Sequence, residues 1–150
     1  MQQHVIIADD DPKLRQELKS LLSTMPGLTV VGEADNGRDA VSLALGQDVD
    51  LVIMDVVMPV MNGVDATRLI QGSKPQIKVV AVSMHSRSSY QKAMQRAGAS
   101  AFVVKNRIGS DLPLALNAVN QGDCYFNGKY NTKSKVLGEV RKVFNPEFLN

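Results

Sequence analysis

The sequence predicts an α/β protein with a doubly wound parallel sheet. Short apolar runs rich in β-branched residues alternate with amphipathic segments, and glycine or proline stands at most of the boundaries between them. Apolar runs of this kind are typical of strands that are buried on both faces. Because each strand is followed by a helix, right-handed crossovers would place helices on both sides of the sheet.

Five strands and five helices follow one another along the chain. The strands are expected at residues 5–8, 28–31, 51–54, 79–83 and 101–104. Pro12, with Asp11 as its cap, begins the first helix, which ends at Pro26-Gly27. The second and third helices follow Gly37 and Gly63. The fourth and fifth are expected at residues 88–97 and 111–120.

The domain is expected to close near Gly122, which defines a first unit over residues 1–122. Residues 123–150 form the remainder, with a linker over 123–130 that has a turn at Asn127-Gly128. Residues 132–144 carry apolar side chains at helical spacing among basic ones, which predicts a C-terminal helical extension.

Composition narrows the class of protein. The chain has 150 residues, of which 44% are hydrophobic and 21% charged, as in a globular domain. A net charge of +2 gives no reason to expect direct binding to nucleic acid or to a membrane. The single cysteine, Cys124, cannot form an internal disulfide, and no leader or membrane-spanning run is visible, so we expect a cytoplasmic protein.

Acidic residues follow two of the predicted strands. Asp9, Asp10 and Asp11 come directly after the first, and Asp55 follows the third. Ligands in open α/β sheets bind at the carboxyl ends of the strands, so these carboxylates would share one crevice if the two strands are neighbours. Carboxylates gathered in this way repel one another and favour a cation, and Mg²⁺ suits such oxygen ligands. The pattern therefore indicates a magnesium site beside an aspartate, while Asp11 is assigned to capping.

A larger pattern resembles a known family. Asp9-Asp10, Asp55, Ser83 and Lys105 each follow a predicted strand, in the order and approximate spacing of the receiver domain of bacterial response regulators. Alone, each has an ordinary explanation as a cap, a turn residue or a solvated side chain. The segments 55–63 and 97–105 are also similar to that family, and further short sequence segments resemble its NarL/FixJ-type subfamily. The resemblance covers roughly residues 4–122 and implies the CheY-like sheet order 2-1-3-4-5.

The resemblance implies a signalling phosphoacceptor rather than an enzyme with an external substrate. Asp55 would accept a phosphoryl group from a sensor histidine kinase and later lose it, both steps being self-catalysed. Mg²⁺ would be held by Asp9, Asp10, Asp55 and the backbone carbonyl of Val57.

The remaining site residues would act on the phosphoryl group and on the switch. Lys105 and Ser83 would each hold a phosphoryl oxygen. Ser83 would then move toward the phosphate and Phe102 would turn inward, which changes the adjacent surface. Because Phe102 has no hydroxyl, we expect its buried rotamer even without phosphate. Asn106 replaces the proline that many relatives carry after the lysine, so this loop is expected to be either trans or strained.

The output is expected to be transcription. Relatives of this subfamily usually continue into a helix-turn-helix domain, which the residues after Gly122 cannot supply, so DNA binding would need a domain absent from this chain. Activation-linked homodimers are common among similar proteins. Two other functions stay open: a receiver-like binding module that works without phosphorylation, and a small Mg²⁺-dependent phosphatase. Val57 counts against the phosphatase, because such an enzyme would carry a second acid two residues after the nucleophile.

Overall fold

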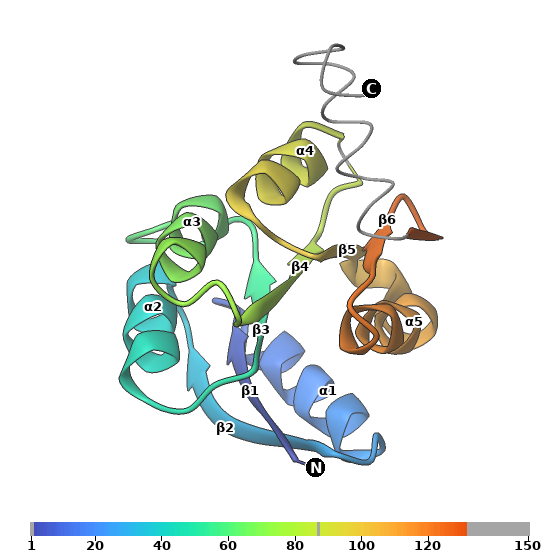
Figure 1. Cartoon of the computed structure of the whole chain (residues 1–150), viewed down its shortest axis with the longest axis horizontal. Helices are drawn as coiled ribbons and strands as arrows, with labels where there is room; N and C mark the ends of the chain where they lie inside the picture. Colours follow the sequence, from blue (N-terminus) through green and yellow to red (C-terminus); the bar gives the residue numbers. More distant parts are fainter. Residues whose placement is uncertain (1, 87, 132–150) are drawn as a thin grey trace, which may run out of the picture.

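The computed structural model describes residues 2–86 and 88–131, which form one sheet with helices on both sides (Figure 1). The order of the strands across the sheet is β2-β1-β3-β4-β5-β6-β7. The first five strands are parallel, and the predicted order 2-1-3-4-5 is confirmed. Their bounds are β1 Gln3–Ala8, β2 Leu28–Ala34, β3 Leu51–Asp55, β4 Lys78–Ser83 and β5 Ala101–Val104.

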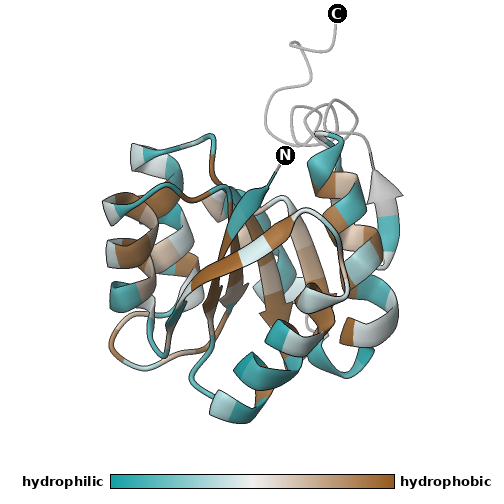
Figure 2. Ribbon diagram, turned by 90° about the horizontal axis from the view of Figure 1, so that it is seen from below, coloured by the Kyte–Doolittle hydropathy of each residue, from teal (hydrophilic) through white to brown (hydrophobic). Residues whose placement is uncertain are grey.

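Helices cover the sheet in two layers. One core cluster joins the sheet to α2, α3 and α4, and the other joins it to α1 and α5. The helices are α1 Pro12–Ser23, α2 Gly37–Gly46, α3 Gly63–Ser73, α4 Ser88–Ala97 and α5 Ile108–Asn120. Figure 2 shows the most hydrophobic segments in the strands, between helices with hydrophilic outer faces. None of the helices in the described part of the chain is long and apolar enough to cross a membrane.

Alternation along β1 shows how the short apolar runs serve both layers. Ile6 and Ala8 belong to the cluster under α2–α4, whereas Val5 and Ile7 belong to the cluster under α1 and α5, and all four are fully buried. Successive side chains of a strand point to opposite faces, so a continuous apolar run is what a sheet covered on both sides requires.

Side-chain caps set the starts of three helices. The carboxylate of Asp11 accepts from the backbone N–H of Lys13, as predicted, and Pro12 occupies the first turn. Asn36 and Asn62 cap α2 and α3 in the same way. The fifth helix begins at Ile108, a turn earlier than the predicted start at 111. A short 3₁₀ helix over Lys105–Arg107 leads directly into it.

The predicted linker over residues 123–130 instead contains two strands. β6 (Cys124–Phe126) pairs in parallel with β5, and β7 (Lys129–Asn131) pairs antiparallel with β6. Asn127 and Gly128 have φ angles of 57° and 67°, the left-handed geometry of a tight hairpin turn. The sheet therefore continues past residue 122, because the edge of β5 accepts another strand. The helix predicted over residues 132–144 lies outside the described residues.

The hairpin is joined to α4 as well as to β5. The Gln91 side chain binds Asn127 twice: Gln91 Nε2 donates to the side-chain Oδ1 of Asn127 at 2.6 Å, and the backbone N–H of Asn127 donates to Gln91 Oε1 at 2.8 Å. Cys124 and Phe126 pack in the same core cluster as Phe102. The hairpin thus completes both the hydrogen bonding and the packing at this side of the sheet.

Candidate functional site

Three carboxylates meet at the carboxyl ends of β1 and β3. Asp9 and Asp10 follow β1, Asp55 ends β3, and one carboxylate oxygen from each lies within 4.8 Å of the others. Asp9 is fully buried and Asp55 is only 4% exposed, whereas Asp10 is exposed. The convergence predicted from the sequence is present because β1 and β3 are neighbouring parallel strands, with Ala8 opposite Met54.

Lys105 closes the cluster from the end of β5. Its Nζ lies 2.8 Å from Asp9 Oδ2 and 3.2 Å from Asp55 Oδ2, and its side chain is 9% exposed. The ammonium therefore bridges the two buried acids and offsets part of their mutual repulsion. The sequence placed Lys105 at this site, but it gave no sign of this direct contact with Asp9.

Burial changes the protonation of the central carboxyl group. Burial, followed by the charge of Asp9, raises the pKa of Asp55 to about 7, against the opposing effect of Lys105. For Lys105, burial lowers the pKa, but its hydrogen bonds and charge interactions with Asp9 and Asp55 outweigh burial and raise it. At neutral pH, a second cation beside Asp55 would favour the ionised carboxylate, which is the nucleophilic form.

The donor set fits Mg²⁺. Asp9 Oδ1 accepts from the N–H of Asp11 at 2.9 Å. Asp9 Oδ2 is buried and lies 2.8 Å from Lys105 Nζ, and no other group of the described residues donates a hydrogen bond to it. Buried carboxylate oxygens with free lone pairs next to the exposed Asp10 suit a hard cation that keeps some of its water. Val57 lies in the loop after β3 with its side chain 56% exposed, and a metal-binding role for its carbonyl stays a prediction.

Ser83 and Phe102 lie on β4 and β5, which follow β3 in the order of the sheet. Ser83 ends β4 at 1% exposure, and its Oγ accepts from the N–H of His85 at 3.1 Å. Phe102 is 5% exposed and packs in a core cluster with Met94 and Phe126. The hairpin helps to cover Phe102, which the sequence analysis did not foresee. The switch roles of Ser83 and Phe102 stay predictions.

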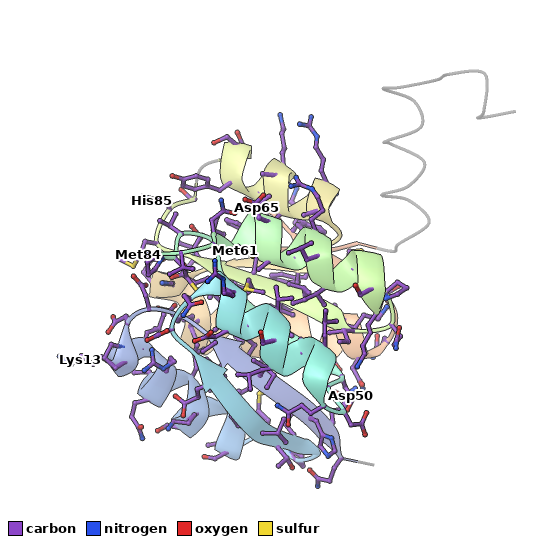
Figure 3. All side chains as sticks on the ribbon, turned by 90° about the vertical axis from the view of Figure 1, so that its left-hand side faces the viewer. Lys13, Asp50, Met61, Asp65, Met84 and His85 are labelled. Carbon is purple, nitrogen blue, oxygen red and sulfur yellow. The ribbon has the colours of Figure 1, made fainter. Side chains whose placement is uncertain are left out.

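The loop after Lys105 takes one of the two forms expected. No cis peptide bond occurs in the described residues, so the bond between Lys105 and Asn106 is trans, and both residues belong to the short 3₁₀ helix. Met84 is 70% exposed and lies next to His85 at the end of the molecule opposite Asp50 (Figure 3).

Arg15 is a site neighbour that sequence reasoning missed. Its Nη1 donates to the backbone carbonyl of Asp9 at 2.6 Å, and its Nε lies 3.1 Å from Glu33 Oε1 on β2. Arg15 is one of several basic residues on α1, and only the fold shows which of them reaches the acidic loop. The sequence carries no local signal that would have identified it.

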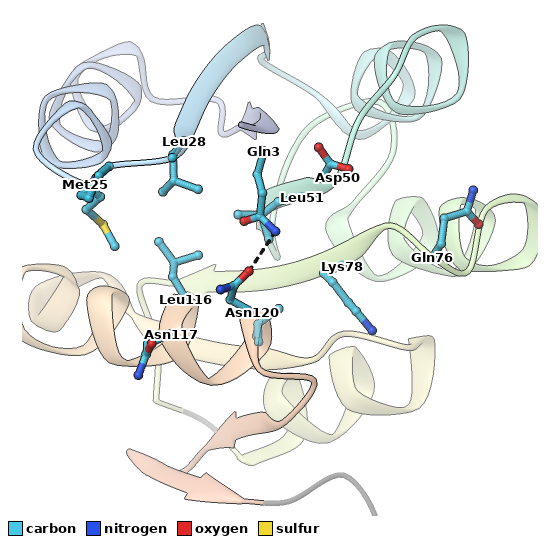
Figure 4. Close-up of a pocket in the computed structure, with 13 residues that line it drawn as sticks. Gln3, Met25, Leu28, Asp50, Leu51, Gln76, Lys78, Leu116, Asn117 and Asn120 are labelled. Atoms are coloured by element: carbon cyan, nitrogen blue, oxygen red, sulfur yellow. Dashed lines mark hydrogen bonds between the residues drawn. The ribbon is translucent and has the colours of Figure 1, made fainter. Parts of the chain in front are cut away.

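A separate cavity of about 390 Å³ lies at the other end of the sheet (Figure 4). It opens between the amino ends of the strands and the end of α5, where Gln3 Nε2 donates to Asn120 Oδ1 at 3.0 Å. Leu51 and Lys78 line it from β3 and β4. None of the residues of the acidic cluster lines this cavity.

Comparisons with known proteins agree with this geometry. Residues 5–117 match the family described as the response regulator receiver domain. The chain is 32% identical over 143 residues to the transcriptional regulatory protein DegU of Brevibacillus brevis, covering 95% of this chain and 60% of DegU. It is 34% identical over 123 residues to the response regulator GacA of Pseudomonas aeruginosa, covering 82% of this chain and 58% of GacA. The chain therefore spans about three fifths of the length of these relatives.

Solved structures give the same result. A LuxR-family two-component response regulator from Aurantimonas sp. SI85-9A1 superimposes with a TM-score of 0.79 at 29% identity, covering 83% of this chain and 89% of the other. The signal receiver domain of the NarL response regulator from Mycobacterium tuberculosis gives a TM-score of 0.75 at 26% identity, covering 81% and 98%.

Proposed function

This chain belongs to the response regulator receiver domain family, and from this premise we propose that Asp55 accepts a phosphoryl group from a sensor histidine kinase in a magnesium-dependent reaction. The single observation that carries the proposal is the cluster itself. Asp9 and Asp55 are buried within reach of one ammonium group and beside the exposed Asp10. In such an arrangement a bound cation can neutralise the carboxylates, and the ammonium can bind a phosphoryl group.

The proposed reaction is an in-line displacement. A carboxylate oxygen of Asp55 attacks the phosphorus of the donor, the bond from phosphorus to the imidazole nitrogen breaks, and an acyl phosphate forms on Asp55. Mg²⁺ held by Asp9, Asp10, Asp55 and the carbonyl of Val57 would neutralise oxygen charge during the transfer. This step needs charge stabilisation and alignment more than it needs proton transfer.

The chain's own side chains would then hold the product. Lys105 already lies 3.2 Å from Asp55 Oδ2, so its ammonium is placed to bind a phosphoryl oxygen there. Ser83 Oγ accepts a hydrogen bond from the His85 N–H, and its hydroxyl proton is available to donate to another phosphoryl oxygen. We propose that Ser83 and Phe102, on the adjacent strands β4 and β5, form the switch that passes the change to α4 and the hairpin.

The output of the switch would be transcription in the cytoplasm. DegU, one of the similar proteins, is a transcriptional regulatory protein, so we propose that DNA is contacted through a domain outside this chain. We also propose that phosphorylation promotes a homodimer. Loss of the phosphoryl group by self-catalysed hydrolysis would reset the switch.

Intact-mass measurement after incubation with acetyl phosphate and Mg²⁺ tests the proposal. The wild-type chain should gain the mass of one phosphoryl group, and Asp55→Asn should gain none. Asp11→Asn is the matched control, because Asp11 is an adjacent acid that caps α1 and lies outside the cluster. No gain in the wild-type chain would favour a binding module, and steady hydrolysis of an external phosphoester would favour a phosphatase.

A further inference from the structure

The backbone of Asp9 is held from two sides by groups outside the acidic cluster. Its N–H donates to the carbonyl of Ala34 at the end of β2 at 3.0 Å, and its carbonyl accepts from Arg15 Nη1 at 2.6 Å. That carbonyl belongs to the peptide that joins Asp9 to Asp10. One side-chain contact therefore fixes the peptide between two of the three acids.

Arg15 is itself held in place. Its side chain, 19% exposed, projects from α1 and forms an ion pair with Glu33 through Nε at 3.1 Å, so different nitrogens of one planar group contact Glu33 and Asp9. Lys19, one turn further along α1, binds the other oxygen of Glu33 at 3.0 Å. The hydrogen bond from Lys19, with smaller contributions from its charge and from Arg15, holds the pKa of Glu33 below its usual value. Glu33 is thus anionic at neutral pH and anchors Arg15 to β2.

We propose that Arg15 is a positioning residue for the metal site, because it fixes the Asp9–Asp10 peptide in the arrangement that binds Mg²⁺. The proposal rests on the proposed function, since it concerns the same cation. Without Arg15 the Asp9 carbonyl loses the side-chain donor that ties this loop to Glu33, and the two carboxylates are free to spread apart under their own repulsion. A ligand set that is not pre-organised binds its metal more weakly.

The charge of Arg15 and its contact with the Asp9 carbonyl predict opposite effects of its removal on Mg²⁺ binding. The guanidinium is a cation next to a cation site, so if Arg15 acted only through its charge, its removal would strengthen Mg²⁺ binding. If Arg15 acts by holding the peptide, its removal weakens Mg²⁺ binding. Lys19 is a matched control, because Lys19→Gln removes the same charge from the same Glu33 without touching Asp9.

Calorimetric titration of the full chain with MgCl₂ provides the measurement. We expect Arg15→Gln to raise the Kd for Mg²⁺ about tenfold, the lower end of the range for residues that support a metal ligand, and Lys19→Gln to change it by less than about twofold. An Arg15→Gln Kd equal to or below that of the wild-type chain would overturn the proposal. So would an equal loss in both variants.

Two further measurements separate positioning from general damage. At saturating Mg²⁺ the phosphorylation rate of Arg15→Gln with acetyl phosphate should approach that of the wild-type chain, so the defect lies in the Mg²⁺ concentration required. If Arg15→Gln is partly unfolded at the assay temperature, Arg15→Lys keeps the charge but has a single nitrogen, and it should weaken Mg²⁺ binding by a smaller factor. An unchanged Kd in Arg15→Lys would then overturn the proposal.

The results that would refute the proposed function differ from those that would refute the role of Arg15. A wild-type chain that neither binds Mg²⁺ nor gains a phosphoryl group would refute the function. A wild-type chain that does both, together with an Arg15→Gln variant that binds Mg²⁺ equally well, would refute only the role of Arg15.

Discussion

The buried carboxyl group of Asp55 should make the metal-free protein less stable as the pH rises. Burial raises the pKa of Asp55 from 3.8 to about 7 in the folded chain. An acid with a raised folded pKa binds more protons in the folded state than in the unfolded state between these two values. The free energy of unfolding therefore falls as the pH rises from about 4 to about 7. Asp55→Asn removes this titration and should stabilise the chain at high pH.

The size of the effect follows from the difference between the two pKa values. If the whole difference in pKa is expressed, ionisation of Asp55 lowers the free energy of unfolding by about 4 kcal/mol at pH 8 and by about 0.5 kcal/mol at pH 4. This is an upper limit, because water and neighbouring side chains rearrange around a charge, and we expect a measured gain of about 2 kcal/mol for Asp55→Asn at pH 8.

Urea unfolding followed by circular dichroism, in the presence of a chelator, measures the difference at about pH 5 and about pH 8. Adding Mg²⁺ at the higher pH should narrow the gap, because a ligand that binds the folded wild-type chain more tightly than the variant stabilises it more. Glu17→Gln, at an exposed position on α1, is the control for the loss of one acid. An Asp55→Asn variant no more stable than the wild-type chain at pH 8 without metal would refute the reasoning.

Three further substitutions test other contacts. Lys105→Met removes a cation that lowers the pKa of Asp55, so metal-free protein should lose stability most above neutral pH in the same urea assay, and an equal loss at both pH values would contradict this. Asn127→Ala removes the side-chain acceptor of Gln91 Nε2, keeps the backbone N–H that donates to Gln91 Oε1, and places alanine at positive φ. The free energy of unfolding should fall by about 2–3 kcal/mol, and an unchanged urea midpoint would count against it. Gly63→Ala would drive a Cβ into the backbone carbonyl of Asp55, so little folded protein is expected, and a wild-type melting temperature would refute this.

The sequence predicted the parts of the fold that depend on local pattern. The five parallel strands could be recognised from apolar runs, and the cap of the first helix from Asp11 and Pro12. The meeting of Asp9 with Asp55 was predictable as well, because neighbouring parallel strands end at the same edge of a sheet.

Features that depend on distant partners could not be predicted. β6 and β7 are three residues each, too short to show a period, and they form strands only because β5 leaves an edge to pair with. The contact of Arg15 with the Asp9 carbonyl depends on how α1 packs beside β2, which no spacing in the sequence records. The early start of α5 depends on the 3₁₀ helix that follows Lys105.

The hairpin after α5 has a practical consequence for anyone who exchanges domains between regulators. The family match ends at residue 117, and a fusion joined there or at residue 122 would remove both outer strands. The backbone of β5 would then become an open edge, and the apolar surface that Cys124 and Phe126 shield would face water. Such a chimera should self-associate for reasons unrelated to signalling, whereas a junction placed after Asn131 keeps the shielding strands with the domain that they protect.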